Sequence, residues 1–124
     1  MFKNTTKYDL EERTAKFGEN MIGFLKTLGK NDINRPLINQ IVRSATSIGA
    51  NYMEANGASS KKDFRNKIFI CKKESRETKH WLRMIVTANP DKSTSCKLLW
   101  KEAHELTCIF SKIIISLENK KLEN

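Results

Sequence analysis

A row of polar side chains lies within the apolar segment between Pro36 and Gly57, whose only charged residues are Arg43 and Glu54. A helix this poor in charge is expected to be buried on most sides, so its two charges need partners elsewhere in the chain. Opposite charges occur further along. Together with the row they form a predicted structural polar cluster: Arg43, Ser47, Asn51, Glu54, Lys67, Glu74 and Glu77.

The charges in this cluster predict a helical hairpin. If the segment and the next helix fold back antiparallel, residue counting places Arg43 opposite Glu74, with Glu77 about one turn further. The same register places Glu54 within a turn of Lys67. We interpret these groups as ion pairs that fix the register of the hairpin. The alternative is a polar surface that lines a cavity or pore.

Residues 77–80 read Glu-Thr-Lys-His, the Glu-x-x-His spacing used by di-iron helical bundles. Such a site needs a second copy of the motif and two more glutamates, whereas the last helix offers Glu102, His104 and Glu105 in a different spacing. The sequence also has no glycine-rich phosphate loop and no nucleophile motif. We therefore predict a protein that is not an enzyme, with no catalytic residue, metal or cofactor.

The elements that must position these residues are helices. Apolar residues recur every three or four positions, and no stretch alternates with period two. Glycine and proline fall mostly where helices should end, at Gly29, Pro36, Gly57 and Pro90. Four helices are predicted, at residues 9–29, 35–57, 61–88 and 94–120. Long helices with short joints predict an all-α fold, an antiparallel up-down-up-down four-helix bundle, in one domain of residues 8–120.

Positive charge is concentrated in one of these helices. The whole chain carries +9, and residues 58–89 alone carry +6, from nine Lys or Arg and three Asp or Glu. At about 100° per residue, six of the basic side chains fall on one line away from the apolar face. We call them the basic stripe: Lys61, Arg65, Lys72, Arg76, Lys79 and Arg83.

The basic stripe indicates a polyanionic partner. It carries no acidic residue and is expected to have no exposed aromatic side chain nearby, which favours phosphate contacts over base stacking. We predict weakly sequence-specific, salt-sensitive binding of RNA or DNA, and the alternative is a solvated face. Binding to a membrane is not expected, because the opposite face of this helix is needed for the core.

Two predicted helices carry apolar residues on the side away from their core stripe. These residues form a predicted oligomer interface: Val42, Gly49, Met53, Trp100, Cys108 and Ile115. Surplus apolar surface on two members of a bundle indicates a homo-oligomer more often than a stray patch. Gly49 would also let another helix approach closely. The same faces could hold a protein partner, so a protein scaffold or accessory factor is the alternative function.

Neither a membrane anchor nor a disulfide framework is indicated. No run of eighteen apolar residues occurs, and the N-terminal residues lack the apolar centre of a signal peptide, which predicts a cytoplasmic protein. The three cysteines, Cys71, Cys96 and Cys108, are an odd number without CxxC spacing. This pattern predicts reduced thiols.

Two stretches carry a family resemblance: residues 40–68 read QIVRSATSIGANYMEANGASSKKDFRNKI, and residues 71–84 read CKKESRETKHWLRM. They resemble the four-helix-bundle proteins encoded within intervening sequences of bacterial 23S rRNA genes. The resemblance implies an up-down bundle without known enzymatic activity, often a homopentamer around a central opening. It also implies a distant relationship to the accessory variability proteins of diversity-generating retroelements, which are basic and bind a reverse transcriptase and nucleic acid.

Overall fold

The computed structural model describes residues 9–123, and side chains within residues 9–120. This part of the chain contains no strand and forms four helices: α1 (Leu10–Leu25), α2 (Asn34–Asn56), α3 (Lys61–Ala88) and α4 (Ser93–Glu123). A short 3-10 turn, η2 (Pro90–Lys92), connects α3 to α4. The predicted all-α four-helix bundle is therefore confirmed.

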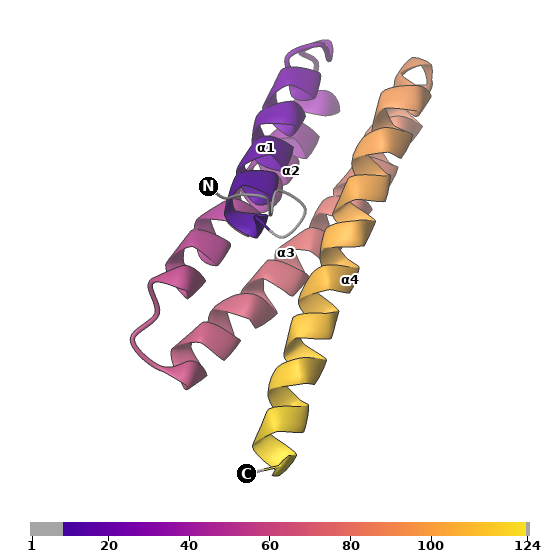
Figure 1. Cartoon of the computed structure of the whole chain (residues 1–124). Helices are drawn as coiled ribbons and strands as arrows, with labels where there is room; N and C mark the ends of the chain where they lie inside the picture. The colour runs from indigo at the N-terminus through magenta and orange to yellow at the C-terminus, as the bar shows by residue number, and fades with distance from the viewer. Residues whose placement is uncertain (1–8, 124) are drawn as a thin grey trace.

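The four helices differ in length, which makes the bundle uneven. α1 has 16 residues and α4 has 31. Figure 1 shows α1 beside α2 at the end of the bundle where the α1–α2 and α3–α4 connections lie. At the opposite end, the α2–α3 turn and the C-terminal turns of α4 extend past α1 (Figure 1). The two halves of the bundle are thus built from different sets of helices.

Two helix ends differ from the prediction. α1 ends at Leu25 instead of residue 29, because the next residues form tighter turns in which Thr27 and Leu28 donate to carbonyls three positions back. The hydroxyl of Thr27 also donates to the carbonyl of Phe24, at 2.6 Å. α4 continues to Glu123 instead of residue 120, and no Gly or Pro occurs there to end it.

Buried apolar side chains from all four helices form one core. Its largest members are fully or almost fully buried: Phe17, Met21, Ile41, Ile48, Ile68, Leu82, Ile85, Leu106 and Phe110. Within each helix, neighbouring members of this set lie three, four, seven or fourteen positions apart, which are spacings that keep them on one helical face. The side-chain periodicity of the sequence thus accounts for which face of each helix is buried.

Short polar side chains begin three of the helices. Asp9 accepts a hydrogen bond from the backbone N–H of Glu12 at the start of α1, and Ser60 accepts one from Asp63 at the start of α3. Asp and Ser are among the residue types preferred as N-caps, because their side-chain oxygens satisfy a backbone N–H of the first turn. At the start of α2, the carbonyl oxygen of the Asn31 side chain accepts from the backbone N–H of Asn34, at 2.8 Å. Ile33, the N-cap residue of α2, makes no side-chain capping hydrogen bond of its own.

A pair of asparagines joins the two connections at one end of the bundle. Asn34 donates to the Asn89 side chain at 3.1 Å, and Asn89 donates back to the Asn34 side chain at 2.9 Å. Asn34 is only 2% exposed. Because a buried amide without partners would be destabilising, this reciprocal pair holds the start of α2 against the end of α3.

Gly49 lies against α1, so the prediction that it faces another subunit is wrong. A Cβ atom at Gly49 would be 3.3 Å from the backbone carbon and the hydroxyl oxygen of Thr14. Val42, another predicted interface residue, is half-buried against the core. The apparent second apolar face of α2 is therefore used in part within the chain, because α1 covers it.

Candidate functional site

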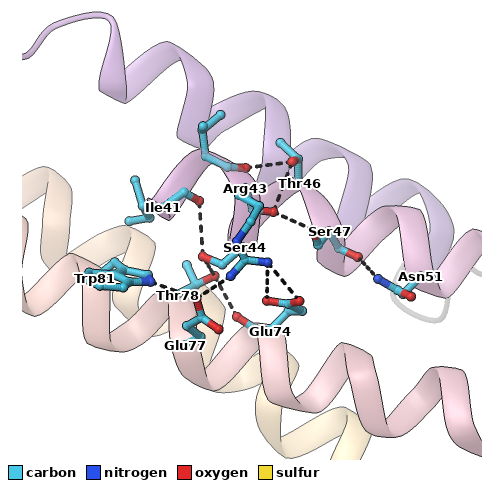
Figure 2. A network of polar contacts seen from close by, with 11 residues as sticks. Ile41, Arg43, Ser44, Thr46, Ser47, Asn51, Glu74, Glu77, Thr78 and Trp81 are labelled. Atoms are coloured by element: carbon cyan, nitrogen blue, oxygen red, sulfur yellow. Dashed lines mark hydrogen bonds and ion pairs between the residues drawn. The ribbon is translucent and has the colours of Figure 1, made fainter. Parts of the chain in front are cut away.

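The charges of α2 and α3 meet as the hairpin register predicts. Nη1 of Arg43 donates to both carboxylate oxygens of Glu74, at 3.3 and 3.2 Å. Nη2 of the same side chain donates to Glu77, and the indole N–H of Trp81 donates to Glu77 at 3.0 Å (Figure 2). This confirms the predicted pairing of Arg43 with both glutamates. The contact from Trp81 was not predicted.

The Arg43 ion pairs lie at the edge of the core, where Glu74 is 7% exposed and the Arg43 side chain is 47% exposed. The hydrogen bonds that Arg43 donates to Glu74 and then to Glu77 raise the pKa of Arg43. The pKa of Glu77 is lowered, first by the hydrogen bond from Trp81 and then, against the opposing effect of burial, by Arg43. Both groups are therefore held in their charged forms.

The remaining members of the structural polar cluster divide into separate contacts. Lys67 donates to Glu54 at 2.8 Å, as predicted. Ser47 and Asn51 instead donate to carbonyls of their own helix, at 2.6 and 2.8 Å. They do not join the ion pairs, because each side chain bonds the carbonyl four residues earlier. The predicted cluster is thus two ion-paired groups linked by the backbone of α2.

Nothing in this cluster requires a ligand. Below the Arg43 ion pairs, the hydroxyl of Thr78 donates to the hydroxyl of Ser44 at 2.9 Å. Among the described side chains, every buried nitrogen and oxygen atom has a hydrogen-bond partner. These observations favour the structural interpretation of the cluster over a polar cavity.

A second set of ion pairs, which the sequence analysis missed, joins α1 to α4. Arg13 donates to both carboxylate oxygens of Glu102, at 2.7 Å each, and to Glu105 at 2.8 Å. From sequence, these two glutamates were considered only as candidate metal ligands. Within the described residues, no group of three or more His, Cys, Asp or Glu side chains could hold a metal ion.

Arg65, near one end of the basic stripe, is ion-paired with an acidic residue of another helix, a contact that was not predicted. Nε of Arg65 donates to Glu118 at 2.7 Å. The guanidinium also lies 4.8 Å from the ring centroid of Phe69. Glu118 is available because α4 runs beside α3 and is long enough to reach the first turns of that helix.

The middle of the stripe lies beside exposed aromatic groups, which also corrects the prediction. Nζ of Lys79 is 3.1 Å from Nδ1 of His104 and 5.2 Å from the ring centroid of Trp100. The rings of His104 and Trp100 stack at 5.1 Å with an interplanar angle of 8°. Trp100 is 43% exposed. Cys108, another predicted interface residue, is exposed beside His104, at 3.7 Å from Nε2.

The rest of the stripe remains available to solvent. Lys61, Arg76 and Arg83 are exposed and Lys72 is half-exposed. Within the described side chains, no ion pair joins these four residues to a carboxylate.

Near Arg83, the adjoining ends of α3 and α4 form a groove of about 300 Å³. Its lining residues are Leu82, Arg83, Val86, Ser93, Cys96, Lys97 and Trp100.

The candidate functional site is therefore a surface shared by two helices. We call it the α3–α4 basic surface and define it by Lys72, Arg76, Lys79, Arg83, Lys97 and Trp100. The first four come from α3 and the last two from α4. Its chemistry is that of clustered cations beside an aromatic ring, an arrangement that can bind anions. The contribution of α4 was not predicted from sequence.

Comparisons with known proteins agree with this architecture. Residues 6–112 match the family model of the 23S rRNA-intervening sequence protein. The chain is 30% identical to a protein of unknown function from the S23 ribosomal protein family of Bacteroides thetaiotaomicron, whose crystal structure aligns with a TM-score of 0.73. The alignment covers 84% of this chain and 96% of that chain. No curated protein matches. No helix among residues 9–123 is long and apolar enough to cross a membrane.

Proposed function

We propose that this chain, which belongs to the 23S rRNA-intervening sequence protein family, is a non-enzymatic protein that binds RNA or DNA through the α3–α4 basic surface. The observation that carries this proposal is the absence, among the described side chains, of carboxylate partners for Lys72, Arg76 and Arg83. Phosphate groups would supply the missing negative charge. Contacts to phosphate carry little sequence information, so the binding is expected to be weakly sequence-specific.

The distribution of ion pairs supports an external anion. Glutamates at the helix contacts pair with Arg13, Arg43, Arg65 and Lys67, and so join neighbouring helices. No such carboxylate reaches the middle of the stripe in the described part of the chain. Like charges held close together repel one another. A polyanion would relieve this repulsion and release its own counterions on binding.

The size of the surface fits a short stretch of nucleic acid. The distance along α3 from Lys72 to Arg83 is about 16 Å at 1.5 Å per residue, which is about five steps of a helix that rises 3.4 Å per base pair. Four phosphate contacts would give a logarithmic salt slope of about −3 for a single strand. The test is therefore to compare the salt dependence of binding in the wild type with that of a variant in which Gln replaces Lys72, Arg76 and Arg83.

A protein-binding function is the second candidate, and exposed apolar side chains favour it. Met53 and Ile115, which were both predicted at an oligomer interface, are 55% and 58% exposed in the single chain. We propose self-association through these residues, and the family resemblance implies five copies. A protein partner could use the same side chains. Light scattering of the wild type and of Ile115→Glu tests this: the wild type should exceed the monomer mass, and the variant should fall toward it.

A further inference from the structure

We propose that the groove beside Trp100 accepts an unstacked nucleobase, so that the protein prefers single-stranded nucleic acid to duplex. This inference rests on the proposed nucleic-acid function and adds the strand preference. It departs from the sequence analysis, which expected phosphate contacts without stacking. The reason for the change is the position of Trp100, which the sequence placed at an oligomer interface and which the structure places beside the basic stripe.

The base of the groove is apolar and rigid. Leu82 is 1% exposed and Cys96 is 4% exposed, so both are fixed by the core. The half-exposed side chain of Val86 adds to this lining. The groove volume of about 300 Å³ is at the lower end of the range for small-molecule sites. A planar apolar group of the size of one base is therefore a suitable occupant.

Trp100 supplies an aromatic wall that is already ordered. Its ring stacks with His104 and lies under the ammonium group of Lys79. These contacts restrict the indole before any ligand binds, which reduces the ordering that binding requires. Stacking of bases on aromatic side chains tolerates any base, because every base has a π-face. The wall therefore fits the weak sequence preference expected of this surface.

Cations from both helices border the same groove. Arg83 belongs to α3 and Lys97 to α4, and none of the residues that line the groove is acidic. The stripe continues from Arg83 toward Arg76 along α3. An occupant that combines a planar apolar group with negative charge on each side matches this arrangement. A nucleotide strand has that chemistry, whereas a duplex keeps its bases stacked inside.

Fluorescence anisotropy with three labelled probes tests the inference: a single-stranded oligothymidylate, an abasic strand of the same length, and a duplex. The full-length chain should bind the oligothymidylate more tightly than either of the others. Trp100→Ala should weaken oligothymidylate binding about 5- to 150-fold, as expected for the loss of one stacked base. Binding of the abasic strand and the duplex should change less than about twofold. Trp100→Phe, which keeps an aromatic face, should recover most of the affinity.

Leu98→Ala is the matched control, because Leu98 is 68% exposed on the same helix and does not line the groove. It should leave all three affinities unchanged, and circular dichroism should show equal helicity in all variants.

If Trp100→Ala weakens the binding of all three probes equally or of none of them, the inference is wrong, although salt-sensitive binding would still support the proposed function. If the wild type binds none of the probes, both fail. A polyglutamate peptide that binds as tightly as the oligothymidylate, with the same loss in Trp100→Ala, would assign the groove to an acidic protein partner.

Discussion

The ammonium group of Lys79 lies over the indole ring of Trp100, 5.2 Å from the ring centroid, although the two residues belong to different helices. From sequence alone, Lys79 was predicted to bind nucleic acid and Trp100 to lie at an oligomer interface. Their contact makes the seam between α3 and α4 a single surface that carries both charge and aromatic area. The proposed function and the strand preference both depend on this seam.

We predict that Arg43→Met lowers the free energy of unfolding by about 1 kcal/mol, because Glu74 loses its charged partner while it stays buried. Hydrogen bonds to charged groups contribute about 1.5–3 kcal/mol, and the exposure of the Arg43 side chain reduces this. Urea denaturation followed by circular dichroism measures the change. Lys67→Met serves as the control, since Lys67 pairs with Glu54 at the solvent-exposed surface, and it should have a smaller effect. Equal effects of the two substitutions would contradict the structural role given to Arg43.

The contrast between two glycines is a test of the α1–α2 contact. Gly49→Val should destabilise the protein by about 1–3 kcal/mol, because the added atoms would be forced against Thr14 in α1. Gly23→Ala should stabilise it by about 0.5–1 kcal/mol, because a Cβ there meets nothing within 4 Å and alanine favours the helix. Thermal and urea unfolding measure both changes. A stable Gly49→Val variant would mean that α1 does not pack closely on α2.

The stability contributed by Glu77 should depend on pH. Its pKa is lower in the folded protein than its ordinary value of 4.5, chiefly because Trp81 donates to the carboxylate. The contribution is therefore fully present above pH 4.5 and is lost as the pH falls through the folded-state pKa. We expect the difference in unfolding free energy between wild type and Glu77→Gln to be constant near neutral pH and to shrink in acid. A difference that grows in acid would have the wrong sign.

One thiol of the three should react in the native protein. Burial raises the pKa of Cys71 to about 12, and it also raises the pKa of Cys96. Cys108 is exposed. Because the thiolate is the reactive form, a disulfide reagent should modify one cysteine per native chain and all three in urea. Cys108→Ser should remove the native reaction, and rapid modification of a second thiol would contradict the burial of Cys71 and Cys96.

The α2–α3 hairpin could be predicted because its turn is short and its charges complement each other. Simple counting across a short turn gave the pairing of Arg43 with Glu74 and of Lys67 with Glu54. Gly49 was misassigned because both sides of α2 carry small or apolar residues. The periodicity of the sequence does not show which of these sides α1 covers.

The α3–α4 seam was harder to predict, because its register depends on the geometry of the connection through η2. Periodicity does not give that geometry. As a result Glu118 was not paired with Arg65, and Trp100 was not placed beside Lys79. The long-range ion pairs of Arg13 were missed for a different reason: the helices that carry them, α1 and α4, are not consecutive in the sequence.

The measurement that tests the central claim most directly is the salt dependence of oligothymidylate binding, between about 50 and 200 mM salt. The logarithm of the binding constant should fall with the logarithm of salt concentration with a slope of about −3 in the wild type. Replacing Lys72, Arg76 and Arg83 by Gln should make the slope shallower by about 2, at about 0.7 per lost phosphate contact. Lys26→Gln, which removes a charge just after α1, should leave the slope unchanged. A triple variant that keeps the affinity and slope of the wild type would contradict the assignment of nucleic-acid binding to the α3–α4 basic surface.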